Sequence, residues 1–193
     1  MAVAGMHTRK GQMNRVAMIS SPSVPAMPAG LLMGLAPIVS RDSVVLVLGS
    51  FPGARSLAQQ QYYAHPQNHF WKILQAVWPA HPLPAGAESY RERCEWLLDR
   101  GLGVWDVYAA CRREGSLDTA IRDAVVNDIA GLALPRLAAI AHNGGESYSH
   151  ARHTGKLGVP VYKLPSTSPA NASWSFERKL AAWREVFVRH GIA

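Results

Sequence analysis

The feature that most constrains the fold is a run of apolar residues, Val44 to Leu48, that stops at Gly49. Five apolar residues without polar alternation predict a strand buried on both faces, as in a parallel sheet. The turn Gly49 to Gly53 and a polar loop follow, and an apolar stripe from Phe70 to Trp78 then predicts a helix. We therefore expect a strand–loop–helix unit whose loop lies where open α/β sheets bind ligands.

Strand and helix patterns alternate along the rest of the chain. Further strands are predicted over 103–108, 137–141 and 159–164. Further helices are predicted over 90–98, 117–128, 146–154 and from Phe176 to Phe187, the last one capped by Ser173 or Ser175. This alternation predicts an α/β fold with right-handed βαβ units and a parallel sheet that carries helices on both faces.

Each predicted strand ends in a polar or glycine-rich turn. These turns are Gly49-Ser50, Asp106, His142-Asn143-Gly144 and Pro165-Ser166. Because the carboxyl ends of parallel strands meet at one edge of the sheet, the four turns are expected to build a single cleft there.

The charge balance points to a polyanionic partner. The 193 residues hold 20 basic and 13 acidic side chains, a formal charge of +7. No apolar run reaches the roughly 18 residues that a membrane span needs. Residues 1–30 contain no acid and no strong periodicity. We expect them to be a disordered leader, with an upstream start codon or a transit peptide as alternatives, and residues 31–193 to form a single domain.

No motif for a metal or an organic cofactor is present. Cys94 and Cys111 do not form a CxxC pair, and the chain lacks GxGxxG, GxxxxGK[ST] and GxSxG. His65 and His69 are four residues apart but straddle a loop-to-helix change, so a shared metal site is not expected. The sequence therefore predicts no cofactor and no metal, and its two thiols suit a reducing, cytoplasmic setting.

The cleft residues suit an enzyme that binds a polyanion and acts on one planar base. Gly49 and Gly53 allow close backbone approach, and Phe51 offers a face for stacking. Asn68 offers a donor and an acceptor near a helix N-terminus. Ser166 and Ser168, with their backbone N–H groups, are candidates for holding a phosphate.

Three segments together resemble one family. They are GSFPGARSLAQQQYYAHPQNHFWKIL (49–74), GVWDVYAACRREGSLDTAI (103–121) and LPSTSPAN (164–171). In this order they are similar to the hypoxanthine-DNA (deoxyinosine) glycosylase branch of the uracil-DNA glycosylase superfamily, over roughly residues 31–190. The resemblance implies a three-layer α/β/α domain with a central four-stranded parallel sheet and no cofactor. It also implies a monomeric, monofunctional hydrolase that binds DNA at the nucleoid and removes deaminated bases, leaving an abasic site.

The chain departs from the superfamily pattern at three positions. Most branches carry Asp or Asn, which positions the attacking water, where this chain has Phe51. We predict that Asn68 replaces it. Leu164 stands where His or Asn is usual, and Ser168 stands where a leucine often wedges into the DNA stack; Trp174 and Asn171 are the candidate substitutes for that wedge.

These considerations give a set of predicted site residues. Asn68 and Asp106 are predicted to be catalytic, and Asp106 is equally compatible with capping a turn. The predicted base-binding residues are Gly49, Ser50, Phe51, Pro52, Tyr62 and Asn143. The predicted DNA-binding residues are His65, Ser166, Ser168 and Asn171.

Several alternatives stay open at this point. Phe51 also fits a core side chain, Asn68 a plain helix cap, Tyr62 a packing residue and Asn143 a turn residue with positive φ. For the whole chain, the alternatives are a uracil-preferring mismatch-type glycosylase and a catalytically silent DNA-binding relative.

Overall fold

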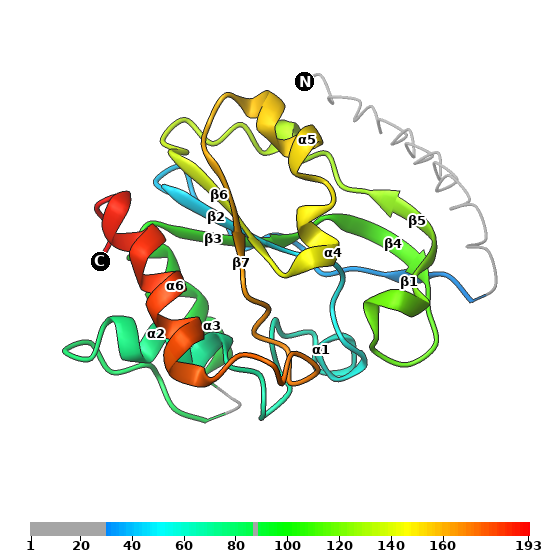
Figure 1. The fold of residues 1–193 in the computed structure, drawn as a ribbon, viewed down its shortest axis with the longest axis horizontal. Coiled ribbons are helices and arrows are strands. Elements are labelled where there is room, and N and C mark those ends of the chain that lie inside the picture. The colour runs from blue at the N-terminus through cyan, green and yellow to red at the C-terminus, as the bar shows by residue number, and fades with distance from the viewer. Residues whose placement is uncertain (1–29, 87–88) are drawn as a thin grey trace, which may run out of the picture.

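The computed structural model describes residues 30–86 and 89–193, so the predicted leader, apart from Gly30, lies outside the described residues. A four-stranded parallel sheet forms the centre (Figure 1). Its strands, in spatial order, are β3 (Leu102–Asp106), β2 (Val45–Gly49), β6 (Ala139–Asn143) and β7 (Val161–Leu164). All four pair in parallel, which confirms the predicted sheet.

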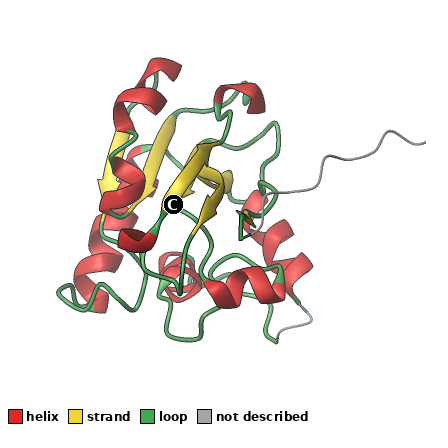
Figure 2. Cartoon of the chain, turned by 90° about the vertical axis from the view of Figure 1, so that its right-hand side faces the viewer, coloured by secondary structure: helices red, strands yellow, loops and turns green. Residues whose placement is uncertain are grey.

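The central strand β2 is buried along its whole length, as its apolar run predicts. Val45 and Val47 point into the larger of two hydrophobic clusters, and Leu46 and Leu48 point into the other. This period of two is expected for a strand covered on both faces. Figure 2 shows helices on both sides of the strands, so the fold is the predicted three-layer α/β/α arrangement.

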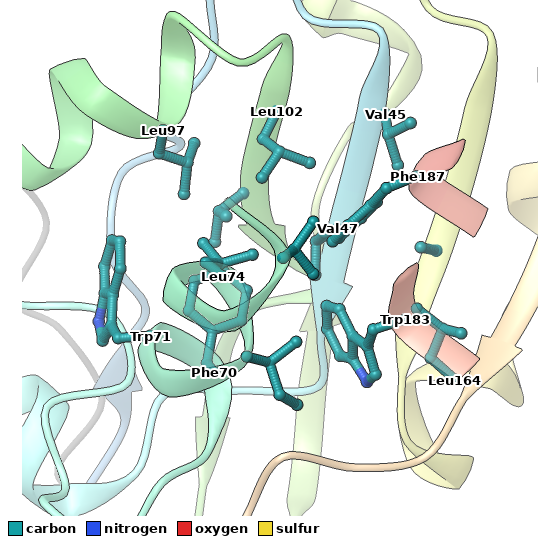
Figure 3. Packing of buried hydrophobic residues seen from close by; sticks show 14 of the residues in the cluster. Val45, Val47, Phe70, Trp71, Leu74, Leu97, Leu102, Leu164, Trp183 and Phe187 are labelled. Atoms are coloured by element: carbon teal, nitrogen blue, oxygen red, sulfur yellow. The ribbon is translucent and has the colours of Figure 1, made fainter. Parts of the chain in front are cut away.

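Three helices cover the face of the larger cluster. They are α2 (Phe70–Val77), α3 (Tyr90–Leu98) and α6 (Phe176–Arg189). Aromatic side chains of α2 and α6 fill the space above the strands, where Phe70 and Trp183 meet edge to face with ring centroids 5.9 Å apart (Figure 3). Ser175 caps α6 by accepting a hydrogen bond from the backbone N–H of Arg178, which is one of the two predicted caps.

The opposite face carries shorter elements. They are α4 (Gly145–Tyr148), α5 (Ala151–Thr154) and a small antiparallel sheet in the order β1 (Leu32–Met33), β4 (Tyr108–Arg112), β5 (Arg122–Val126). The remaining elements are α1 (Ala54–Gln59) and the 3-10 turns Asp118–Ala120, Ala130–Leu132 and Gly155–Leu157.

The predicted helix over 146–154 is wrong in one respect, because the structure has two short helices there, α4 and α5. The break lets Ser147 and Thr154 hydrogen-bond opposite ring nitrogens of the buried His142.

The predicted helix over 117–128 is wrong. Only Asp118–Ala120 turns, and Arg122–Val126 is a strand that pairs with β4. All five residues of this strand are exposed, so pairing with β4, and not the burial of an apolar helix face, holds the segment in place. The predicted strand over 103–108 is likewise two strands, because the chain leaves the parallel sheet at Asp106 and enters the antiparallel one at Tyr108.

The aromatic core makes a prediction about stability. Phe187 is fully buried and stacks on Trp78 with ring centroids 5.5 Å apart. We expect Phe187→Ala to lower the free energy of unfolding by about 3–5 kcal/mol, since it removes packed ring atoms and leaves a cavity. The neighbouring Val188 is 53% exposed, and Val188→Ala is the matched control. Urea denaturation followed by circular dichroism measures both, and equal losses for the two variants would contradict this account of the core.

Candidate active site

A pocket of about 420 Å³ opens at the carboxyl ends of the parallel strands. This volume lies within the range of small-molecule sites. All twelve predicted site residues line it: Gly49, Ser50, Phe51, Pro52, Tyr62, His65, Asn68, Asp106, Asn143, Ser166, Ser168 and Asn171. The predicted single cleft at one sheet edge is thus present, and the segments that build it come from four separate parts of the chain.

The floor of the pocket is formed where β2 and β3 end side by side. Gly49 pairs with Asp106 in the sheet register. A Cβ atom at position 49 would overlap with Oδ1 of Asp106, so only glycine leaves room for this carboxyl group. Asp106 is 3% exposed, and its Oδ2 has no hydrogen-bond partner among the residues that the structure describes. An unpartnered buried carboxyl oxygen in a pocket is available to a ligand.

The surroundings of Asp106 favour its protonated form. Burial and, to a smaller extent, the nearby carboxylate of Asp118 raise the pKa of the carboxyl to about 8, while Arg113 acts in the opposite direction. Removing a carboxylate from water disfavours its charged form, and a second carboxylate nearby does the same. At neutral pH the group therefore holds a proton and can donate a hydrogen bond into the pocket.

One wall of the pocket comes from the connection between β4 and β5. The Ser50 hydroxyl donates to Oδ1 of Asp118 at 2.6 Å, and the backbone N–H of Ala54 donates to Oγ of Ser116 at 3.0 Å. The Arg113 guanidinium donates to the Pro52 carbonyl and lies over the Phe51 ring. Three hydrogen bonds thus fasten this connection to the loop that follows β2.

The second wall is the segment that leads into α2. Oδ1 of Asn68 accepts a hydrogen bond from the backbone N–H of Phe70 at 2.9 Å, although His69 occupies the N-cap position. The Asn68 amide nitrogen has no partner within residues 30–86 and 89–193, so Asn68 supports the helix start and still presents an NH₂ group to the pocket. Beside it, Tyr63 stacks on Phe70 with ring centroids 4.0 Å apart.

The third wall is the turn after β7. The side chain of Asn143 donates to Oγ1 of Thr167 and accepts from the backbone N–H of Thr167, each at 2.9 Å. Asn143 lies in β6, and the positive φ of the turn belongs to Gly144. The alternative of a positive-φ turn residue at Asn143 is therefore wrong; Asn143 fastens the β7 turn to the sheet.

The other predicted DNA-binding residues of this turn form hydrogen bonds within the turn. Oγ of Ser166 accepts from the backbone N–H of Ser168, and the Asn171 side chain donates to the Ser166 carbonyl. Lys179, buried in α6, donates to the Asn171 carbonyl at 2.9 Å. The loop is therefore preorganised before any DNA binds.

Two of the predicted residues lie at the boundary between core and pocket, and a third lies at the mouth. Phe51 is 6% exposed, and it belongs to a hydrophobic cluster and is also one of the residues that line the pocket. Tyr62 is also buried, and its hydroxyl donates to the Leu35 carbonyl. His65 is exposed at the mouth, with Nδ1 accepting from the backbone N–H of Gln67.

Within the described ranges, no group of three or more His, Cys, Asp or Glu side chains is placed to hold a metal ion. Over the same part of the chain, every helix is too short or too polar to cross a membrane.

Comparison with known proteins assigns the family. A model of the uracil DNA glycosylase superfamily matches residues 36–187, which is most of the chain. The chain belongs to this superfamily. Two archaeal relatives, from Methanosarcina acetivorans and Methanosarcina barkeri, are each named hypoxanthine DNA glycosylase. Each is 33% identical to this chain, and each alignment covers 81% of this chain and 98% of the relative.

A solved structure agrees with this assignment. The solution NMR structure of a protein from Methanosarcina acetivorans, named as a candidate uracil DNA glycosylase, superimposes with a TM-score of 0.71 at 30% identity. The match covers 83% of this chain and 98% of that one. The family predicted from the three sequence segments is confirmed. This glycosylase superfamily member is a DNA N-glycosylase, an enzyme of DNA repair whose substrate is DNA that carries a damaged base.

The glycosylase pocket also contains residues that sequence reasoning missed. Asp118 was placed in the predicted helix over 117–128, and Ser116 and Thr167 were given no place in the site. The signal that could have found Ser116 and Asp118 is their position inside the second of the three family-like segments, next to a glycine that breaks helices.

The close approach of Gly49 to Asp106 makes a prediction. We expect Gly49→Ala to displace the Asp106 carboxyl and to lower the free energy of unfolding by about 1–3 kcal/mol, as overpacking does. Gly53→Ala is the matched control, because a Cβ there would meet its nearest neighbour, Oγ of Ser116, at an ordinary 3.7 Å. Thermal unfolding of both variants tests this, and a Gly49→Ala protein as stable as Gly53→Ala would refute the overlap.

Proposed function

We propose that this glycosylase removes hypoxanthine from DNA that contains deoxyinosine, by flipping the nucleotide into the pocket and hydrolysing its N-glycosidic bond. The names of the two archaeal relatives support the choice of base. The observation that carries the proposal is the proton-bearing, unpartnered Asp106 carboxyl at the floor of a pocket large enough for a purine. The product is an abasic site.

Base flipping follows from the depth of the site. Asp106 and Phe51 are both almost fully buried, so a base inside a duplex cannot reach them. Extruding a base costs a few kcal/mol and costs least when the base is mismatched. Hypoxanthine opposite thymine is therefore easier to extrude than a normal pair, and in the pocket the Phe51 ring stacks on the extruded purine.

Asn68 holds the attacking water. Its Oδ1 has a second lone pair beyond the one that Phe70 uses, and its NH₂ group is free of other described residues. These two groups orient a water molecule toward C1′ of the flipped nucleotide. The hydrogen bond from Phe70 fixes the amide plane, so this orientation is set before the substrate binds.

Asp106 acts on the departing base. The sequence predicts a catalytic role for Asp106, and a protonated carboxyl is better suited to donate a hydrogen bond than to accept a proton. As the glycosidic bond breaks, negative charge develops on the purine, and a placed donor in a pocket closed to water stabilises that charge. The same donor does not distinguish purines by itself, so base selection also depends on the pocket walls.

The turn after β7 and the mouth of the pocket contact the DNA backbone. Arg55 lines the pocket and brings a positive charge close to the flipped nucleotide's phosphates. His65, Ser166, Ser168 and Asn171 lie on the same side and present polar groups to the strand. These contacts position the DNA without reading its sequence.

A cleavage assay tests the choice of base. Duplexes that carry one inosine, one uracil or one xanthine are incubated with the enzyme and then with alkali, which breaks the strand at abasic sites. We expect cleavage to be fastest at inosine. Faster cleavage at uracil would favour the uracil-preferring alternative, and an intact inosine strand in an otherwise active preparation would refute the proposal.

Removing the Asn68 side chain tests its role. We expect Asn68→Ala to lower the single-turnover rate by about 10²- to 10³-fold, the usual effect of losing one positioned polar group, with little change in DNA affinity. Gln67→Ala, at the exposed neighbouring position, is the control and is expected to keep full activity. A catalytically silent DNA-binding protein would have no turnover for either variant to lose.

The proton on Asp106 makes a prediction about pH. With a pKa near 8, the active protonated form is complete at pH 6–7 and is lost as the pH rises through about 8. The charged groups that act on this carboxyl are Asp118 and Arg113. Asp106→Asn cannot titrate but keeps a donor, so its rate is expected to be lower and flat over pH 6–9. If the variant's rate fell with pH as the wild type's does, another group would be responsible.

A further inference from the structure

One exposed apolar side chain stands at the rim of the pocket. Leu117 is 60% exposed and is one of the residues that line the pocket. The other large apolar side chains that are exposed in the described ranges are Met33, Val125, Val126, Tyr148, Trp174 and Val188. None of these lines the pocket. A single exposed leucine is ordinary on a protein surface, so its position and its support decide whether it has a role.

The support of Leu117 is unusual for an exposed side chain. The residue before it, Ser116, accepts a hydrogen bond from the Ala54 backbone, and the residue after it, Asp118, accepts one from Ser50. Both partners belong to the loop that forms the base site. The backbone at Leu117 is therefore fixed on both sides relative to the pocket, while the side chain projects free of the core.

A flipping enzyme needs an apolar group at this kind of place. When a nucleotide leaves the duplex, a gap one base deep opens in the stack, and proteins that disturb the stack insert Phe, Leu, Ile, Met or Pro there. The gap lies beside the point where the base enters the enzyme. A leucine on a fixed backbone at the pocket mouth needs no backbone reordering on insertion, and its burial against neighbouring bases is favourable.

We propose that Leu117 enters the DNA stack and occupies the gap that the flipped base leaves. This inference rests on the base-flipping reaction proposed above. It assigns this role to the β4–β5 connection, because the apolar side chains that the β7 turn brings to the pocket, Pro169 and Ala170, are shorter than leucine.

The alternative residues fit this role less well. Trp174 is 36% exposed, but it does not line the pocket, and the Arg178 guanidinium covers its ring at 4.4 Å from the centroid. Asn171 uses its amide to donate to the Ser166 carbonyl and to accept from the Ser173 hydroxyl. Inserting either one would first break contacts that hold the turn in place.

Binding to a gap already present in DNA tests the inference without any cleavage. The probe is a duplex with one tetrahydrofuran abasic analogue, compared with the same duplex intact, and affinity is measured by fluorescence anisotropy. We expect the wild type to prefer the gapped duplex and Leu117→Ala to lose about 10-fold of that preference, because alanine is too short to fill the gap in the stack. Leu117→Met keeps an apolar side chain of similar size and is expected to keep the preference.

Val125→Ala is the matched control, since Val125 is 53% exposed on the neighbouring strand and does not line the pocket. It is expected to behave as the wild type does. An unchanged preference in Leu117→Ala would overturn the inference, and so would a loss confined to Trp174→Ala. Cleavage of inosine duplexes is measured in parallel. No cleavage by the wild type would refute the proposed reaction, whereas the binding comparison would still show whether Leu117 enters the DNA stack.

Discussion

The site depends on one close approach, the backbone of Gly49 against the carboxyl of Asp106. It is possible because β2 and β3 are parallel neighbours in register and because residue 49 has no side chain. The approach keeps water away from the carboxyl, and exclusion of water is what retains its proton at neutral pH. The sheet fixes the positions of Gly49 and Asp106, and the three walls surround them. The parallel sheet is therefore the part of the fold that determines the chemistry.

Retaining that proton has a thermodynamic cost. An ordinary carboxyl has a pKa near 4 in an unfolded chain, so at pH 7 it is ionised there and protonated in the fold. Folding must therefore take up a proton, and the contribution of Asp106 to stability, complete below about pH 4, is lost as the pH rises through its folded pKa of about 8. Large hydrophobic clusters on both faces of the sheet offset this cost. Such local destabilisation is common where a residue is placed for function.

The sequence predicted the parallel sheet and the residues at its edge, but not the small antiparallel sheet. The apolar run at β2 and the aromatic stripe of α6 are local patterns whose period identifies them. The strand at Arg122–Val126 has no such pattern, because every one of its residues is exposed and its order comes from pairing with β4. The roles of Ser116 and Asp118 depend on hydrogen bonds to Ala54 and Ser50, which are more than 60 residues away. Contacts of that kind leave no periodic trace in a single sequence.

The passage of the chain from one sheet to the other at Val107 has a consequence for how such enzymes diversify. The floor of the pocket belongs to the parallel sheet, whereas Ser116, Leu117 and Asp118 belong to a connection in the antiparallel one. Strand β5 is exposed, so changes in its sequence remove few core contacts. Insertions or substitutions in this outer sheet alter the shape of the pocket mouth while the buried core around β2 stays intact. A single catalytic floor can in this way serve relatives that accept different bases.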